Sequence, residues 1–330
     1  MKNVRKFFLL SGIAIAMTFV FISCNDDDND PNDPLLAPAT ITDVAIASPD
    51  LSSLVAALNE AELANTLAGD GPFTVFAPTN DAFASFLTDN GFTSVEDVPD
   101  AVLEQVLLNH VVSGQLPAAA LTTSYVSSLS TAGPDDRALS LYVDVSSGVE
   151  INGVTVITAD IPASNGVIHV VDEVIDLPTV ADHAVINPGL SELVGALTAE
   201  GQPDFVATLS TPAGTDPAPF TVFAPIDSAF QTLGDAAPEG DALTAVLNHH
   251  VIAGANIVSG DLSDGLVSPA TLEGDTLTFS ADNDTFSITD GLGNSGVGIV
   301  VANIQAVNGV VHAIDAVLLP DTENDTEEED

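Results

Sequence analysis

The chain has 330 residues, and its 48 acidic side chains face only four basic ones, which gives a formal net charge of −44. Three of the basic residues, Lys2, Arg5 and Lys6, open the chain, so Arg137 is the one cation among all the carboxylates that follow. This composition excludes an ordinary nucleic-acid-binding protein and electrostatic docking on anionic lipid, because nothing in the chain could neutralise the phosphates.

Residues 1–24 have the pattern of a secretory signal peptide. A basic start precedes an apolar stretch at 7–22, which is short for a membrane span and is followed by acidic residues. The stretch ends at Ser23-Cys24, and a small residue before the chain's only cysteine resembles a bacterial lipobox. The resemblance implies cleavage before Cys24 and acylation of Cys24, so we expect a lipoprotein. The alternative is an ordinary signal peptide in which the cysteine is incidental.

Acidic segments stand at both ends of the remaining chain. Residues 25–38 and 321–330 are rich in Asp and Glu and poor in apolar residues, so we predict a disordered tether and a disordered tail. Acidic residues after a lipid-bearing cysteine also resemble the surface-export signal of some Gram-negative lipoproteins, but a solvated spacer would look the same. We therefore expect an outer-membrane lipoprotein and leave its exposure on the cell surface open.

Between these segments four sequence blocks occur twice in the same order. They are Pro-x-Leu-Ser-x-Leu at 49–54 and 188–193, Phe-Thr-Val-Phe-Ala-Pro at 73–78 and 220–225, a histidine block at 109–112 and 249–252, and Asn-Gly-Val-x-His at 165–169 and 308–312. The nearly constant offset predicts two tandem domains, at 39–178 and 179–320, because the period is far too long for a solenoid repeat.

Each copy has the same order of predicted elements. In the first copy, apolar spacing predicts a helix at 51–58, a strand at 73–77, a helix carrying Phe83 and Phe86 after a cap at 79–81, and a helix at 102–112. Strands follow at 139–145, 149–157 and 167–175, and in the second copy at 276–280, 285–289, 298–301 and 310–318. Helices before strands indicate an α+β fold, for which we expect an antiparallel sheet.

The repeated blocks resemble the signatures of the fasciclin-type (FAS1) adhesion domain. The resemblance implies, for each copy, a wedge-shaped β-sandwich with surrounding helices, and a role in adhesion or extracellular matrix instead of catalysis. The motif residues it marks as structural or interacting are Phe73, Thr74, Phe76, Pro78, Asn109, His110, Asn165, Gly166, His169, Phe220, Thr221, Phe223, Pro225, His249, His250, Asn308, Gly309 and His312. Asn109 and His249 stand where the family has the tyrosine of its Tyr-His block, so integrin binding is not carried over.

The histidines are the natural candidates for chemistry. His110, His169, His250 and His312 recur at matching positions and could in principle supply a base or a metal ligand, but a histidine within an apolar run is more often hydrogen-bonded in a core. We therefore predict a structural role for these four and surface positions for His183 and His249, which have no matching histidine. The chain has no nucleophile-elbow, zinc-protease or phosphate-loop motif, and the glycines at 291–296 predict a turn.

The acidity has two possible explanations. Calcium could bind at 26–33, at 282–284 or in the tail, but no segment fits the calcium loop, so we predict weak, diffuse divalent-cation binding and no cofactor. Adaptation to salty water is the second explanation, since salt screens repulsion between like charges.

Taken together, these features predict a non-enzymatic adhesion or binding lipoprotein of the cell envelope. Its expected partners are other cell-surface or matrix proteins, a second copy of itself, or polysaccharide, and the membrane is reached through acyl groups on Cys24. The alternative is a glycan-binding accessory protein. The chain has no tryptophan and only two tyrosines, Tyr125 and Tyr142, so it offers few aromatic rings for stacking against sugars, and this counts against the glycan-binding alternative.

Overall fold

The computed structural model describes residues 39–234, 237–282 and 285–321, and these belong to one compact unit that begins at Pro38. The signal peptide with Cys24, the acidic tether, and the acidic tail beyond Asp321 lie outside the described residues. Of the three predicted calcium segments, only Asp282 and Asp321 are described.

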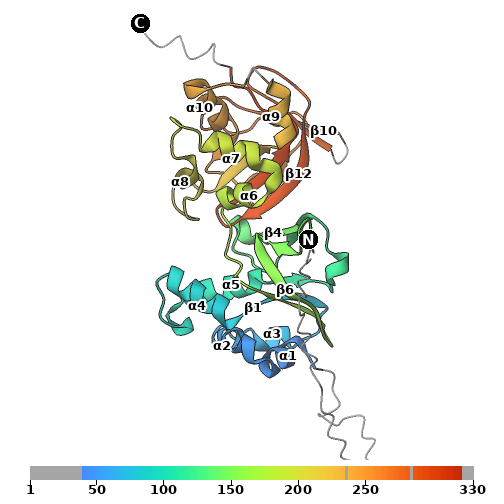
Figure 1. Cartoon of the computed structure of the whole chain (residues 1–330). Helices are drawn as coiled ribbons and strands as arrows, with labels where there is room; N and C mark the ends of the chain where they lie inside the picture. The colour runs from blue at the N-terminus through green and yellow to red at the C-terminus, as the bar shows by residue number, and fades with distance from the viewer. Residues whose placement is uncertain (1–38, 235–236, 283–284, 322–330) are drawn as a thin grey trace, which may run out of the picture. The chain divides into compact units, whose positions relative to one another are not determined.

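The first copy runs from blue to green in Figure 1. Its helices are α1 (Ile41–Ala47), η1 (Pro49–Leu51), α2 (Ser52–Glu60), α3 (Ala64–Leu67), α4 (Asn80–Asp89), η2 (Val95–Asp97), α5 (Asp100–Asn109), η3 (Ala118–Ala120) and η4 (Pro134–Asp136). Its strands are β1 (Phe73–Pro78), β2 (Val111–Ser113), β3 (Ser124–Ser127), β4 (Ser140–Asp144), β5 (Glu150–Ile151), β6 (Val154–Ala163) and β7 (Gly166–Val171).

The second copy repeats this order from yellow-green to red. Its helices are α6 (Val180–Ile186), η5 (Pro188–Leu190), α7 (Ser191–Leu197), α8 (Phe205–Leu209), α9 (Asp227–Leu233), α10 (Gly240–His249) and η7 (Ser259–Asp261). Its strands are β8 (Phe220–Pro225), β9 (Val251–Ala253), β10 (Thr278–Asp282), β11 (Thr285–Thr289), β12 (Val297–Ala306) and β13 (Gly309–Ile314).

Each copy carries one mixed sheet that contains a parallel pair of inner strands. The strand orders are β2-β1-β7-β6-β5-β4-β3 and β10-β11-β12-β13-β8-β9. The pairs β1–β7 and β8–β13 are parallel, and the other pairs are antiparallel. The prediction of an antiparallel sheet is therefore wrong for these pairs. The roughly 90 residues between β1 and β7 give the chain enough length for the crossover that a parallel pair needs.

The first sheet curls until its two ends meet. Val112, in the middle of β2, forms a bridge with Ser128, directly after β3, although these strands stand at opposite ends of the strand order. Side chains of β1 alternate between two apolar layers, as in any strand. Val75 faces the layer formed with the helices, and Phe76 faces the layer inside the curl. The inner layer is the sandwich that the fasciclin resemblance implies.

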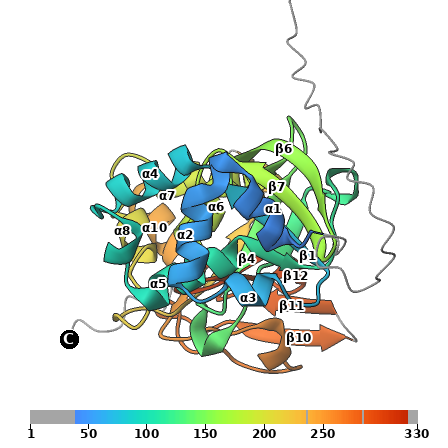
Figure 2. The same ribbon diagram turned by 90° about the horizontal axis from the view of Figure 1, so that it is seen from below.

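Helices α1 and α6 open the two copies and were not predicted. Each starts with a capping box, Thr40 with Asp43 and Thr179 with Asp182, in which the threonine side chain accepts a backbone N–H and the aspartate accepts the N–H of the threonine. Seven-residue helices are too short for a clear apolar period, so the caps were the available signal. Figure 2 views the first copy from the side on which α1 and α2 lie.

Among the described residues, no single helix has the length and hydropathy needed to cross a membrane. The segments Ile41–Ala47 and Pro49–Glu60 pass that test only as a pair, and they are bent against each other by 108°.

Both tyrosines of the chain lie where β3 and β4 contact the second copy. The Tyr125 ring lies 5.0 Å from that of Tyr142 and 5.8 Å, edge-on, from that of His183, between ring centroids. Asn187 donates to the Tyr125 hydroxyl at 3.2 Å, and the Gln305 backbone N–H donates to Ser140 Oγ at 2.9 Å. The tyrosines are thus packed inside the protein and do not form a free aromatic platform.

Candidate functional site

The histidine that follows α5 or α10 ties the helix end to the last segment of its domain. His110 Nδ1 lies 2.7 Å from the Val106 carbonyl, and its Nε2 accepts the Ile175 N–H at 2.9 Å. His250 makes the same pair of bonds in the second copy, to Val246 and Leu318, at the same distances. Because an N–H must donate to Nε2, the ring is neutral and carries its proton on Nδ1. Burial lowers the pKa of both histidines to about 4.

The second recurring pair, His169 and His312, takes the opposite tautomer. Each Nε2 lies 2.9 or 2.8 Å from a main-chain carbonyl, that of Leu116 or Ile257, to which it donates. Each Nδ1 accepts a backbone N–H from the strand beside it, at 3.3 Å and 3.4 Å. The rings stack on Phe76 and Phe223.

The Asn-Gly turns join β7 and β13 to the helices. Asn165 Oδ1 accepts the first N–H of α1 at 2.9 Å, and its Nδ2 donates to the carbonyls of Leu67 and Gly69. Asn308 binds in the same way to the first N–H of α6, to the last residue of α8 and to Thr211. A Cβ on Gly166 would lie 2.0 Å from the Phe73 carbonyl oxygen, and one on Gly309 2.2 Å from that of Phe220. Only glycine fits at these two positions.

The remaining motif residues lie on the paired strands β1 and β8. Thr74 and Thr221 are fully buried, and each hydroxyl donates to a loop carbonyl while accepting a loop N–H. Pro78 and Pro225 end their strands opposite Val171 and Ile314. The structure therefore brings three of the four repeated blocks, those with the strand, histidine and Asn-Gly motifs, together around the parallel strands. The main chain occupies both nitrogens of all four recurring histidines, which leaves none of them free for a substrate or a metal.

The prediction that His183 and His249 lie on the surface is wrong, because both are 0% exposed. His183 lies against the second copy's own sheet, with Nε2 3.2 Å from the Gln305 carbonyl, and burial lowers its pKa to about 4. His249 is the last residue of α10, three residues after the buried Val246, so it falls on the apolar face of that helix. Its helical position was the sequence signal that could have placed it inside.

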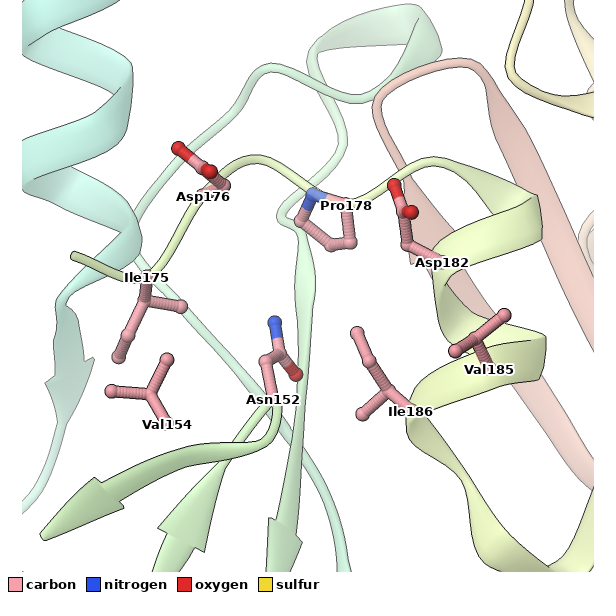
Figure 3. A pocket seen from close by; sticks show the side chains of 8 residues that line it. All are labelled: Asn152, Val154, Ile175, Asp176, Pro178, Asp182, Val185 and Ile186. Carbon is pink, nitrogen blue, oxygen red and sulfur yellow. The ribbon is translucent and has the colours of Figure 1, made fainter. Parts of the chain in front are cut away.

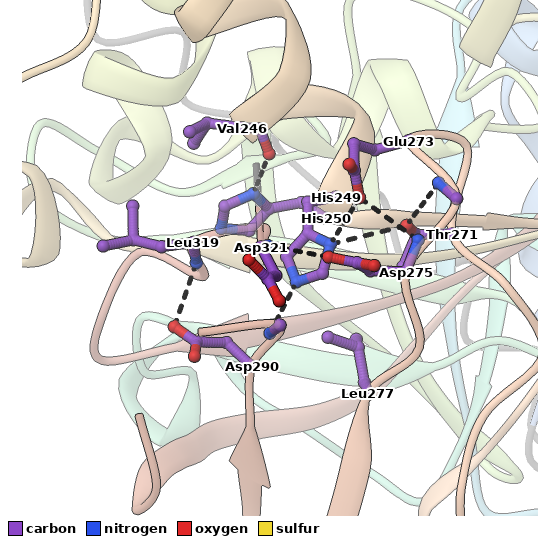
Figure 4. Close-up of polar contacts among 12 residues, drawn as sticks. Val246, His249, His250, Thr271, Glu273, Asp275, Leu277, Asp290, Leu319 and Asp321 are labelled. Atoms are coloured by element: carbon purple, nitrogen blue, oxygen red, sulfur yellow. Dashed lines mark hydrogen bonds and ion pairs between the residues drawn. The ribbon is translucent and has the colours of Figure 1, made fainter. Parts of the chain in front are cut away.

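His249 belongs to a cluster with Glu273 and Asp275, which we call the acidic histidine cluster (Figure 4). Its Nδ1 lies 3.2 Å from Glu273 Oε2, and one potential ligand atom from each of the three residues lies within 4.8 Å of the others. The Gly291 N–H donates to Nε2 at 3.1 Å, so Nδ1 carries the proton and donates to Glu273. Burial lowers the pKa of His249, and the charge of Glu273 opposes that effect.

The first domain lacks this cluster at the corresponding place. Its residue at the end of α5 is Asn109, which is fully buried and donates to the Asp176 carbonyl at 2.9 Å. Glu273 follows Leu272, whose N–H binds the Val251 carbonyl; the matching bond in the first domain joins Leu129 to Val111, and Ser130 follows. The two copies thus differ at both positions.

A hollow of about 240 Å³ lies beside the segment that joins the copies (Figure 3). Asn152, Asp176 and Asp182 supply its polar lining, and the rest of its wall is formed by Val154, Ile175, Pro178, Val185 and Ile186. Asn152 Nδ2 is buried without a hydrogen-bond partner. Burial raises the pKa of Asp176, and the charge of Asp182 raises it further.

Comparison with known families identifies the fold. A model of the fasciclin domain matches two segments, residues 49–178 and 188–320. The chain belongs to the fasciclin family. A solved FAS1 domain pair from the insect cell adhesion molecule Fasciclin I is similar with a TM-score of 0.50 and 20% identity, covering 82% of this chain and 97% of that one. The likeness to that fasciclin pair shows the tandem fold.

Curated fasciclin relatives include proteins of bacteria and of animals. Protein sll1483 of Synechocystis sp. is 43% identical over 136 residues, which are 41% of this chain and 72% of that protein. Cell surface glycolipoprotein MPB83 of Mycobacterium bovis is 32% identical over 147 residues, covering 43% and 60%. Transforming growth factor-beta-induced protein ig-h3 of Sus scrofa is 29% identical over 266 residues, covering 77% of this chain but only 35% of that protein.

Proposed function

We propose that this tandem fasciclin protein is a non-enzymatic adhesion module of the cell envelope that makes cell–cell, cell–surface or matrix contacts. Fasciclin domains occur in cell-adhesion proteins. The observation that carries the proposal is that the side chains of the recurring motif are already bonded: in both domains its asparagines, threonines and histidines form hydrogen bonds with the domain's own main chain. The motif therefore builds the fold, and the outer surface is left to make contacts.

The anchor in this proposal is an acylated Cys24 in the outer membrane, with residues 25–38 as a tether. Its support is the apolar stretch that ends at the chain's single cysteine and the acidic run that follows. One relative is itself named a cell surface glycolipoprotein. Lipid at one residue holds a hydrated domain at a membrane.

Two such molecules can come into contact only if the electrostatic repulsion between their acidic surfaces is reduced. A surface with so many carboxylates and one cation, Arg137, repels a second copy at low salt, and both salt and divalent cations reduce that repulsion. Two domains on one tether gain avidity, because the second contact forms at a high effective concentration. We therefore propose many weak, cation-dependent contacts to a protein partner or to a second copy.

A bead assay tests both parts of the proposal. The full-length chain and a Cys24→Ala variant are produced in a Gram-negative host, and only the unsubstituted chain is expected to float with lipid and to label with palmitate. Lipid-coated beads carrying the unsubstituted chain should then cluster with each other, or bind envelope material, in 0.5 M NaCl with calcium. Beads that stay dispersed and bind only specific glycans on an array would support the glycan-binding alternative instead.

A further inference from the structure

We propose that His249, Glu273 and Asp275 form a zinc-binding site in the second fasciclin domain. The three side chains come from the last residue of α10 and from the loop that precedes β10. An imidazole nitrogen and two carboxylate oxygens are ligands that Zn²⁺ takes, and three protein ligands leave a fourth position open. The inference goes beyond the proposed adhesion and does not depend on it.

The distances suit a zinc ion with little movement. Two ligands bound at ordinary zinc distances in a tetrahedral site lie about 3.3 Å apart. His249 Nδ1 and Glu273 Oε2 are already 3.2 Å apart, and one ligand atom of each of the three residues, Asp275 included, lies within 4.8 Å of the other two. Asp275 is held in place because its Oδ2 accepts the Asp321 N–H at 2.7 Å. Only the last ligand has to approach.

Burial and charge favour a divalent cation over water here. His249 is fully buried, and the side chain of Glu273 is 7% exposed. The two carboxylates of the cluster lie near a third, that of Asp290, whose charge also acts on His249. Arg137, the one cation after residue 6, belongs to the first domain, so the cluster has no arginine or lysine of its own domain to neutralise it. A dehydrated metal ion is the largest charge that could balance such a site.

Binding has a defined consequence for the proton of His249. The Nδ1 proton now donates to Glu273, and zinc needs the Nδ1 lone pair, so this proton must leave that atom. If it moves to Nε2, it meets the Gly291 N–H, which now donates to Nε2 at 3.1 Å. Zinc binding therefore breaks the Gly291 hydrogen bond and moves the turn after Asp290. The Gly291 amide becomes a local reporter that ions on the outer surface would not move.

The first domain suggests a variant that should fold. His249→Asn gives α10 the residue that ends α5, where Asn109 is buried in the same position. Glu273→Gln removes a second ligand while keeping its size. Asp241→Asn is the matched control, because it removes one exposed carboxylate from α10 eight residues before His249, about 12 Å along the helix.

The test is a zinc titration of the full-length chain carrying Cys24→Ala, by competition with a chromophoric chelator and by amide NMR. We expect one site above the diffuse background, a loss of at least tenfold in its affinity in His249→Asn and Glu273→Gln, and no change in Asp241→Asn. The Gly291 amide signal should shift with zinc, and calcium, which prefers oxygen ligands, should not depend on His249. Equal zinc affinity in all four chains, or a Gly291 signal that does not respond, would overturn the site and leave only adventitious carboxylate binding.

Discussion

At the scale of single residues, the fasciclin motif acts through hydrogen bonds to the main chain. His110 and His250 hold one tautomer because a backbone N–H points at Nε2, and His169 and His312 hold the other because a carbonyl faces Nε2. A buried ring with both nitrogens bonded is costly to replace, since removing it leaves main-chain groups without partners. The motif residues therefore stabilise the fold and do not form a ligand-binding site of their own.

The glycines of the two Asn-Gly turns give the sharpest test at this scale. Gly166→Ala and Gly309→Ala place a Cβ at 2.0 and 2.2 Å from a strand carbonyl oxygen, so we expect each to lower the free energy of unfolding by more than about 3 kcal/mol or to prevent folding. Gly153→Ala is the control: its φ of +82° is strained for alanine but its Cβ meets no atom within 4 Å, so about 1 kcal/mol is expected. Urea unfolding measures all three. Equal losses at the three positions would contradict the steric argument.

Acid should destabilise the protein through its buried histidines. The pKa of His110, His183 and His250 is lowered by burial to about 4, against 6.5 when unfolded. Stability is therefore complete above pH 6.5 and falls as pH drops toward 4, by about 2 kcal/mol per ring at pH 5. Urea unfolding between pH 7.5 and 5, before most carboxylates titrate, measures the loss. A free energy of unfolding that stays constant over this range would show that these rings are not buried in neutral form.

At the scale of elements, the ends of helices and strands carry information that apolar periodicity does not. The helix predicted at 102–112 ends at Asn109, because Val111 and Val112 pair with β1. The predicted cap at 79–81 is confirmed at Thr79, whose hydroxyl accepts the Ala82 N–H. Helices α1 and α6 are marked only by their capping boxes. The hydrophobic pattern thus determines the order of helices and strands along the chain, and local side-chain hydrogen bonds determine where the helices begin.

Removing the capping threonines tests that conclusion. Thr40→Ala and Thr179→Ala each leave first-turn N–H groups without a partner, and we expect each to cost about 1 kcal/mol. Thr88→Ala, an exposed position late in α4, should change stability by less than about 0.5 kcal/mol. Chemical denaturation of the three variants is sufficient. A loss of unfolding free energy in Thr88→Ala as large as in the two cap substitutions would contradict the conclusion that the caps determine α1 and α6.

At the scale of the whole molecule, self-repulsion is the dominant electrostatic feature. A net charge of −44 on 330 residues favours expansion of the chain, and the repulsion is screened over about 8–10 Å at ordinary salt. The contact of Tyr125 with His183 and Asn187 joins the two domains with uncharged groups, which avoids adding to this repulsion. The stability of the two-domain chain should therefore depend on salt, which screens the repulsion between its carboxylates.

Salt should therefore raise the melting temperature. We expect a continuous increase between 0.05 and 1 M NaCl, and the same increase with KCl, because screening depends on ionic strength and not on the identity of the cation. Scanning calorimetry or circular dichroism measures it. A melting temperature that is flat in both chlorides but rises in sulfate would show exclusion of salt from the surface instead of charge screening.

The sequence by itself determined the repeat, most strands and longer helices, and the family. These features are local: they depend on apolar periods, turn residues and short motifs that occur twice in the same order. The Asn-Gly pairs were recognised as turns from their residue types, although the close strand contact of each glycine and the helix contacts of each asparagine appear only in the fold.

Only the tertiary structure decided which distant residues meet. The parallel pairs β1–β7 and β8–β13 depend on a crossover of roughly 90 residues, and strand patterns do not encode direction. His249 was expected at the surface because it has no matching histidine, yet the packing of α10 buries it beside Glu273 and Asp275. In the sequence His249 is separated from Glu273 and Asp275 by β9, η7 and loops, so the common site exists only once the second sheet and its helix have packed together.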